Sequence, residues 1–367
     1  MRATIQADHL AAALKSSVAP ATTPMDVLRH ASLTAHRDQL VIETTDGVVY
    51  LRTAVPAQVE TEGQILLPAA LLAPVAAAPG EIALRDTGEL QRGRSRFRLP
   101  VRPASEWPGQ VPEDWEPVDV DAEHLRDAIE SVSHASADDS DLRAYLRGLH
   151  VVPGMVWASD AKSLAFARLD YTGPVLVIPG QPLRRIVGLL GEGARVEVAR
   201  VSAGQAGALR ITCGPQCITL RLLDSKPLDM PSHLGSLTVG DACATVRRAD
   251  LLAAVRRFMP FATMHEGTKK AIPMIVLELA GGDLTVADAR EESRESLAEA
   301  LVESSGSWRA GIDAQRLIRA LGAIGGELVC LHAPPKRGKS SNNDAWRLHP
   351  AGAAPADHAH FIAPLTL

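Results

Sequence analysis

One short pattern occurs three times in this chain, about a third of its length apart. The copies are Asp8–Leu14, Glu123–Ile129 and Ala249–Val255, and each is an amphipathic helical start. Their aligned leucines, Leu10, Leu125 and Leu251, lie 115 and 126 residues apart. Solenoid repeats have periods of about 20–50 residues, so this longer period indicates three copies of one complete domain.

Further landmarks keep the same order. Short strand-like runs precede the helical starts at residues 3–5, 118–120 and 244–246. A second strand leads into a second helix, and a proline or aspartate four residues before the aligned leucine favours a helix start there. These residues are Pro68, Pro179 and Asp313. Turn aspartates follow at Asp46, Asp160 and Asp288, 114 and 128 residues apart. We therefore predict three domains, residues 1–117, 118–239 and 240–367.

The rest of each repeat has the pattern of an antiparallel sheet. Period-2 runs at residues 39–44, 195–199 and 283–287 predict strands, and the glycine-containing turns between them favour antiparallel pairing. Each copy is expected to be two helices on a curved sheet, in the α+β class. The composition of residues 290–303 favours a helix, but their place in the repeat favours an acidic loop leading into a strand, which we expect. Linkers are expected at 108–117 and 234–241, and a basic loop at 334–343.

Length and composition fit three intracellular domains. A chain of 367 residues allows three domains of about 120 residues each. Four cysteines are too few for a disulfide framework, and no secretory segment precedes the first strand-like run. The longest apolar stretch, Ile65–Pro79, is interrupted by prolines and is shorter than a membrane span of about 20 residues. We expect a cytoplasmic protein without a membrane partner.

Charge is distributed unevenly over a chain whose formal net charge is −5. Arginines gather on the second helix of the middle repeat and on the first helix of the third repeat. The members of interest are Arg184, Arg185, Arg247, Arg248 and Arg256. On one helix, a solvated face balanced by neighbouring acids would be the simpler interpretation. Recurrence in two repeats instead favours a positive surface on a negative body.

No catalytic or metal-binding pattern is convincing. Gly338-Lys339-Ser340 resembles the end of a phosphate-binding loop, but Ala333 stands where that motif needs a glycine. Cys213 and Cys217 flank a hairpin turn and lack a second ligand pair. Asp138, Asp139 and Asp141 are better explained as a solvated loop than as a metal site. His265-Glu266 lacks the second histidine of a metalloprotease helix, and His358 and His360 are expected to be exposed on a final strand.

The chain resembles the bacterial DNA polymerase III beta subunit, the sliding clamp, over its whole length. The most specific stretches are Gly93–Leu99 with Ala104–Pro108, Asp141–Gly148, and the tail Phe361–Leu367. The resemblance implies a processivity factor that is not an enzyme and has no cofactor. It also implies a homodimer closed head to tail into a ring around double-stranded DNA. Twelve helices of about 10 Å each would leave a central hole wide enough for a duplex.

The resemblance assigns roles to particular residues. Arg184, Arg185, Arg247, Arg248 and Arg256 would face DNA, and the basic loop at Lys336–Lys339 could add a contact. Trp107 and Phe261 resemble the apolar dimer contacts, although packing in the protein's own core explains them equally well. The polymerase catalytic subunit and the clamp loader would insert short linear peptides between the second and third domains. The matching pocket residues are Leu146, Ser159, Leu164, Leu228, His233, Ile272, Arg316, Phe361, Ile362, Ala363, Pro364 and Leu365.

The predicted pocket departs from the family pattern. Where the family has Thr-Asp-Gly-His-Arg-Leu, residues 159–164 read Ser-Asp-Ala-Lys-Ser-Leu, without the glycine and the arginine. Where the family has Phe-Pro-Asp-Tyr, residues 227–230 read Pro-Leu-Asp-Met. The leading hypothesis is a clamp that tethers the replicative polymerase to DNA. The alternatives are an accessory clamp that serves a repair or mobile-element polymerase and, more distantly, an enzyme built on repeated α+β domains.

Overall fold

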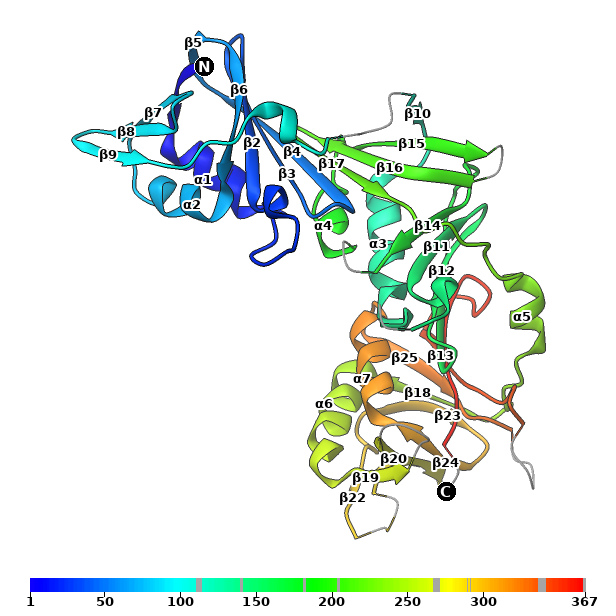
Figure 1. Ribbon diagram of the computed structural model, residues 1–367. Coiled ribbons are helices and arrows are strands. Elements are labelled where there is room, and N and C mark those ends of the chain that lie inside the picture. The colour runs from blue at the N-terminus through cyan, green and yellow to red at the C-terminus, as the bar shows by residue number, and fades with distance from the viewer. Residues whose placement is uncertain are drawn as a thin grey trace. The chain divides into compact units, whose positions relative to one another are not determined.

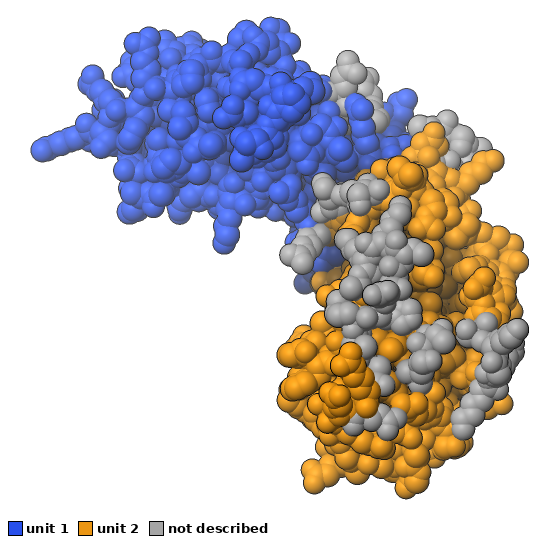
Figure 2. Space-filling model, turned by 60° about the horizontal axis from the view of Figure 1, so that its bottom comes forward, with its two compact units in different colours: residues 1–123, 184–222 blue, residues 124–183, 223–367 orange. Residues whose placement is uncertain are grey.

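The computed structural model describes residues 1–109, 114–138, 141–180, 183–202, 205–266, 271–288, 290, 292–335 and 341–365. The chain divides into two compact units, which Figure 2 colours separately. Unit 1 contains residues 1–123 and 184–222, and unit 2 contains residues 124–183 and 223–367. No helix within the described ranges is long and apolar enough to cross a membrane.

The elements follow one another in three successive sets. The first set is β1 (Arg2–Gln6), α1 (Ala7–Lys15), η1 (Asp26–Arg29), β2 (His30–His36), β3 (Gln39–Thr45), β4 (Val49–Pro56), β5 (Gln58–Thr61), β6 (Gly63–Pro68), α2 (Ala69–Ala76), β7 (Glu81–Arg85), β8 (Glu89–Arg92), β9 (Ser95–Arg98) and η2 (Ala104–Glu106). The second set is β10 (Glu116–Pro117), α3 (Ala122–Val132), η3 (Ser133–Ala135), η4 (Ala144–Leu146), β11 (Gly148–Val152), β12 (Met155–Ser159), β13 (Ser163–Arg168), β14 (Leu176–Pro179), α4 (Leu183–Val187), β15 (Arg195–Ser202), β16 (Gln205–Cys213), β17 (Gln216–Arg221) and α5 (Met230–Ser236). The third set is β18 (Cys243–Arg247), α6 (Arg248–Phe258), η5 (Met259–Phe261), β19 (Thr263–Glu266), β20 (Ala271–Ala280), β21 (Asp283–Ala287), β22 (Arg294–Ser296), β23 (Leu301–Ser305), β24 (Trp308–Asp313), α7 (Ala314–Ala323), β25 (Leu328–His332), β26 (Trp346–Pro350) and β27 (His358–Ile362).

Two strand pairings recur in all three sets. The first strand of each set pairs antiparallel with the strand after the second helix, as β1–β7, β10–β15 and β18–β25. The strand before that helix pairs with a strand that follows the first helix, as β6–β2, β14–β11 and β24–β20; in the third set β19 lies between α6 and β20. The chain is therefore three tandem copies of one two-helix, antiparallel-sheet domain, as the repeat predicts.

The sheets run on from one copy to the next. In unit 1, β17 of the second copy pairs with β4 of the first in a sheet of order β10-β15-β16-β17-β4-β3-β2-β6. In unit 2, β13 of the second copy pairs with β27 of the third in the order β14-β11-β12-β13-β27-β26-β25-β18-β23. Each ladder attaches half of the second copy to a neighbour, which explains why the compact units number two. The domain boundaries after residues 117 and 239 stay a prediction.

Apolar positions at helical spacing bury one face of each long helix. In unit 1, α1 and α2 lie side by side (Figure 1), and Leu10 and Leu72 are fully buried in the core with Leu33 of β2. In unit 2, α6 and α7 bury Leu251 and Leu317 in the same way. Each fully buried leucine contributes about 1.5–3 kcal/mol relative to an exposed one. The apolar side chains at period-3.6 spacing, which predict these helices in the sequence, thus pack the helices against their sheets.

Most of the expected elements are present, with two corrections. The strands expected at 39–44, 195–199 and 283–287 are β3, β15 and β21, and β22 and β23 lie in the ambiguous stretch 290–303. The strand expected at 118–120 is wrong: β10 ends at Pro117, and the Val118 amide makes the last bond to β15, 2.9 Å from the Val196 carbonyl oxygen. The linker expected from residue 234 begins inside α5, whose first turn is capped by Asp229.

Candidate functional site

The junction of the second and third copies in unit 2 lies along the β13–β27 ladder. Leu164 pairs with Phe361 and Ala165 with His360, although these partners are almost two hundred residues apart in the chain. Ala363 continues the contact, because its amide donates to the Lys162 carbonyl oxygen at 2.8 Å. The sequence-predicted pocket residues on β13 and in the C-terminal tail therefore meet at this ladder.

Phe361 and Ile362 point to opposite faces of the sheet, because successive side chains of a strand alternate. Ile362 is buried in the core that contains Leu317 of α7. Phe361 belongs to a second apolar cluster, with Leu164 and with Met230 of α5. Trp157 and Phe166 also belong to that cluster, and sequence reasoning did not select them or Met230 as site residues. The sequence signal for Trp157 and Phe166 is the apolar character of β12 and β13, and Met230 on α5 has no comparable signal.

The remaining pocket candidates are distributed more widely. Leu146 of η4 is buried, Leu228 is 38% exposed just before α5, and His233 is exposed on α5. Ile272 lies on β20, opposite His265, and is not part of the cluster around Phe361. In the tail, Ala363, Pro364 and Leu365 are half-buried, and Leu365 forms a bridge to Gly311 of β24. Thr366 and Leu367 lie outside the described residues.

The turn between β12 and β13 is organised by Asp160. Its Oδ1 accepts the amides of Lys162 and Ser163 at 2.9 and 2.7 Å, and the Ser163 hydroxyl at 2.9 Å. Ser159 contributes its hydroxyl, which accepts the Ala161 amide at 3.1 Å and donates to the Ser163 carbonyl oxygen at 2.9 Å. The polar atoms of the candidate pocket residue Ser159 are thus committed to the turn.

Ala161 occupies a backbone conformation that favours glycine. Its φ is +69°, in the left-handed region where a Cβ atom costs about 1–2 kcal/mol. This is the position at which the family pattern has glycine. We predict that Ala161→Gly raises the free energy of unfolding of unit 2 by about 1 kcal/mol, since the strain relieved exceeds the added chain entropy. Urea denaturation followed by tryptophan fluorescence measures this change. Ala298→Gly, in an exposed turn without a positive φ, is the control and should give no stabilisation.

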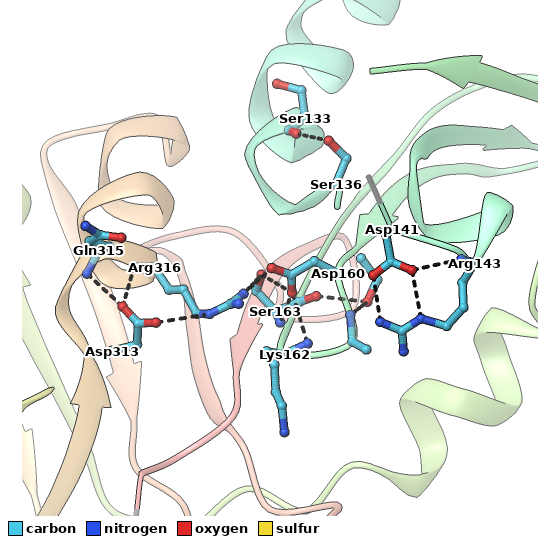
Figure 3. Close-up of polar contacts among 12 residues, drawn as sticks. Ser133, Ser136, Asp141, Arg143, Asp160, Lys162, Ser163, Asp313, Gln315 and Arg316 are labelled. Atoms are coloured by element: carbon cyan, nitrogen blue, oxygen red, sulfur yellow. Dashed lines mark hydrogen bonds and ion pairs between the residues drawn. The ribbon is translucent and has the colours of Figure 1, made fainter. Parts of the chain in front are cut away.

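Arg316 connects this turn to α7, as Figure 3 shows. Its Nη1 makes an ion pair with Asp160 and donates to the Ser163 hydroxyl at 2.9 Å, while its Nε lies 3.2 Å from Asp313. Asp313 also caps α7, accepting the amides of Gln315 and Arg316 at 2.9 and 3.2 Å. The side chains of Arg316, Asp160 and Asp313 are only 21%, 14% and 11% exposed. We name the side chains of Arg316, Asp160, Asp313 and Ser163 the Arg316 network; it joins the second copy to the third.

The predicted DNA-facing arginines differ in what their side chains do. Arg248 donates to the carbonyl oxygens of Leu321 and Gly326 at 2.9 and 2.8 Å, so it caps the C-terminal end of α7. Arg247 is paired with Asp250 at 2.6 Å. Arg256, on the next turns of α6, is exposed and makes no ion pair within the described ranges. In unit 1, Arg185 of α4 is exposed, and the side chain of Arg184 lies outside what the structure describes.

The two predicted dimer contacts are aromatic residues at least partly open to solvent. Trp107 follows η2 in unit 1 and is half-buried. Phe261 ends η5 in unit 2 and is 56% exposed, with its ring 6.0 Å from that of Phe258. Isolated exposed apolar residues are common, but a large exposed aromatic ring is typical of contact surfaces. Exposure of Phe261 argues against the alternative that it packs in its own core.

The residues considered and rejected as catalytic or metal-binding candidates either have structural partners or lie outside the described residues. Asp141 accepts the Arg143 guanidinium at 3.0 and 2.8 Å, which lowers the pKa of its carboxyl group to about 2. Cys213 and Cys217 are free thiols at the two ends of the β16–β17 hairpin. Asp139 and the basic loop residues Lys336–Lys339 lie outside the described residues. Within the described ranges, no group of three or more His, Cys, Asp or Glu side chains is arranged to hold a metal ion.

One sequence expectation about the last strand is wrong. His360 was expected to be exposed on β27, but it is only 1% exposed and His358 is half-buried. The reason is that this face of β27 is the one that carries Ile362 into the α7 core, and His134 of η3 covers the same place. Alternation within a strand does not reveal that both faces of β27 are covered.

Known proteins match this chain at both levels, sequence and structure. Residues 1–112 match the model of the DNA polymerase III beta subunit, N-terminal domain. The beta sliding clamp of Vibrio cholerae is 27% identical over 279 residues, covering 70% of this chain and 74% of that protein. The beta sliding clamp of Streptomyces coelicolor is 27% identical over 312 residues, covering 79% of this chain and 81% of that protein. A solved DNA polymerase sliding clamp of Pseudomonas aeruginosa superposes with a TM-score of 0.81 at 27% identity, covering all of both chains.

The thrice-copied domain and its match along the whole chain define a sliding clamp, a non-catalytic processivity factor of DNA replication. Within that class, the chain is similar to the bacterial DNA polymerase III beta subunits, from which it diverges to 27% identity.

Proposed function

We propose that two copies of this chain close head to tail into a ring around duplex DNA and tether DNA polymerase III there. The full-length superposition on a solved sliding clamp is the observation on which this proposal depends. A head-to-tail contact closes a ring only if its rotation fits, and three similar domains per copy supply a regular rotation. A closed ring is retained on DNA by topology, so it needs only weak contacts that allow sliding. We place this activity in the cytoplasm, where the replication machinery works.

The DNA contact that we propose is electrostatic and independent of sequence. Arg185 on α4 and Arg256 on α6 are exposed basic residues on helices of two different copies. Phosphate contacts of this type position a protein on DNA without reading bases. Arg248 acts indirectly in this scheme, because its guanidinium holds the end of α7 beside α6.

We predict that Arg185→Glu combined with Arg256→Glu shortens retention on circular duplex DNA severalfold. The reason is that two phosphate-attracting charges become repulsive, and the effect should grow as salt is lowered. Loading the ring on nicked circular plasmid and measuring its dissociation from the intact circle over time is a suitable assay. Arg195→Glu makes the same charge change on an exposed position of β15 and should have little effect. Equal retention of both variants would refute the assignment of the DNA-facing helices.

The partner contact that we propose lies beside the apolar cluster of unit 2. Leu228 is 38% exposed and lies two residues before Met230 of that cluster. Of the half-buried tail residues, Ala363 bonds to the turn held by the Arg316 network and Leu365 bonds to Gly311 of β24. Short linear peptides bind such apolar surfaces through a few buried side chains. The polymerase catalytic subunit and the clamp loader are the partners that we propose for this surface.

We predict that Leu228→Ala weakens binding of a polymerase-derived clamp-binding peptide by at least about tenfold, which corresponds to 1.4 kcal/mol of lost contact. Fluorescence anisotropy with a labelled peptide measures this. Val101→Ala is the matched control, because Val101 is also 38% exposed but belongs to unit 1. If both variants bind as the wild type does, the peptide surface is elsewhere. Removing residues 364–367 should abolish binding altogether.

An accessory role is the second candidate function, and the altered turn favours it. Ala161 and Ser163 replace the glycine and arginine of the family pattern, and Leu228 stands where the family has proline, so peptide preference should differ from that of a main clamp. Binding peptides from the replicative and the repair polymerases of the same cell in one competition assay separates the two functions.

A further inference from the structure

Three imidazole rings form a continuous hydrogen-bonded chain across the junction of the second and third copies. His358 and His360, both on β27, place their Nε2 atoms 2.9 Å apart. The other ring nitrogen of His360, Nδ1, lies 3.3 Å from Nε2 of His134, on η3. The rings of His134 and His360 are stacked with centroids 5.0 Å apart. His360 is thus hydrogen-bonded at both ring nitrogens, to His358 of its own copy and to His134 of the second copy.

The surroundings of this histidine chain disfavour positive charge. His360 is 1% exposed, between Ala165 of β13 and Leu348 of β26. Among the described residues, the charged and titratable groups that act on the three rings are Arg319 of α7, Asp160 of the β12–β13 turn and His349 of β26. The backbone of Ser131, in α3, also contacts His134. The Ser131 backbone and Asp160 favour a protonated His134 ring, but the carboxylate of Asp160 is already paired with Arg316.

The neutral chain satisfies both N···N contacts. Each contact needs one N–H and one lone pair, and three neutral rings supply these in either of two directions. Burial lowers the pKa of His134 to about 4, lowers that of His358, and holds that of His360 well below 6.5. Arg319 lowers the pKa of His134 further. All three rings are therefore uncharged at neutral pH.

Acid should open this contact, and the sign follows from those pKa directions. A histidine released into water titrates near 6.5, whereas the packed rings stay neutral to lower pH. Below about pH 6.5 the released state takes up protons that the packed state does not, so release becomes easier as pH falls. Each proton taken up favours release by up to tenfold per pH unit.

We propose that His134, His358 and His360 are positioning residues that fasten β27 and the tail residues 361–365 to the second copy, and that release of this fastening becomes easier below about pH 6.5. This inference rests on the proposed function in one respect, namely that the tail forms part of the peptide-binding surface. Partner docking by this clamp is then sensitive to protons, in a range just below neutrality.

Hydrogen–deuterium exchange of the full chain without peptide tests the fastening itself. After correction for the intrinsic pH dependence of exchange, protection of residues 358–362 should fall at least tenfold between pH 7.5 and 5.5. In the double variant His134→Gln and His360→Gln, protection should be the same at both pH values. The control His233→Gln alters an exposed histidine on α5 and should keep the wild-type pH response. A wild-type β27 that is protected equally at both pH values would overturn the proposal.

Two further measurements keep the test decisive. If the double variant does not fold, His358→Gln, which alters a half-buried ring, should still reduce the pH response. Ring-nitrogen NMR of the wild type should show all three imidazoles neutral at pH 5.5, and independent titration near pH 6.5 would overturn the proposal.

Peptide binding at pH 7.5 tests the proposed function alone. Peptide affinity that stays constant to pH 5.5 while β27 loses protection would refute the link to docking.

Discussion

Replacing Arg316 by alanine should destabilise unit 2 by about 3 kcal/mol. The change leaves the carboxylates of Asp160 and Asp313, which are 14% and 11% exposed, without their shared guanidinium. Removing one partner of a buried ion pair costs about 3–5 kcal/mol, and residual solvent access places this case at the lower end. The Ser163 hydroxyl also loses the donor that lies 2.9 Å away. The ion pairs that are lost lie at the junction between the second and third copies, which the β13–β27 ladder also connects.

Urea unfolding followed by tryptophan fluorescence measures this loss, because Trp157, Trp308 and Trp346 all lie in unit 2. Asp160→Asn combined with Arg316→Ala should cost less than the sum of the single changes, since both remove the same interaction. Arg257→Ala is the matched control: it breaks an ion pair with Glu295 in which the arginine is 58% exposed, and such pairs contribute at most about 1 kcal/mol. A loss for Arg316→Ala no larger than that of the control would contradict the role of the Arg316 network.

Replacing Phe261 by arginine should convert the proposed dimer into monomers. Phe261 is 56% exposed in the single chain, and an aromatic anchor at the centre of an interface contributes about 2–4 kcal/mol. That loss weakens the dimer about 30- to 1,000-fold, before the cost of burying a new charge is added. At micromolar concentration the wild type should have about twice the chain mass of 39.0 kDa, and the variant the mass of one chain.

Sedimentation velocity over a concentration series measures both masses. Leu142→Arg places the same charge on a residue that is 99% exposed in the second copy, and it should leave the dimer intact. Because Phe261 is largely exposed, its replacement should change the thermal stability of unit 2 little. A Phe261→Arg protein that remains a dimer would show that the ring closes through another surface.

Local signals explain why so much of the fold was predictable. The helices α1, α3 and α6 each have a leucine as their fourth residue in an amphipathic pattern, and that pattern depends only on neighbours along the chain. Asp313 was recognised as a helix start because its type and spacing are those of an N-cap, and its side chain does cap α7. The strand at 118–120 was misplaced because the position of β10 depends on its pairing with β15, about eighty residues further along the chain.

Side-chain roles were predictable only where charge and exposure coincide. Arg256 is exposed, as a basic surface residue should be, but Arg248 on the same helix uses its guanidinium to cap α7. Nothing in the local sequence distinguishes the two, because the carbonyl groups that Arg248 meets lie more than seventy residues away. The same holds for His360, whose burial depends on η3 of another copy.

The sequence by itself determined the threefold repeat, the two helices and the antiparallel strands of each copy, because these follow from periodicities of a few residues. Only the tertiary structure decided that Arg316 joins Asp160 to Asp313 and that three histidines meet at the β13–β27 ladder. The contacts of Arg316 with Asp160 and of His360 with His134 require residues about 150 to 230 positions apart to converge. Such convergence is set by the pairing of whole strands, for which no single segment of the chain contains the information.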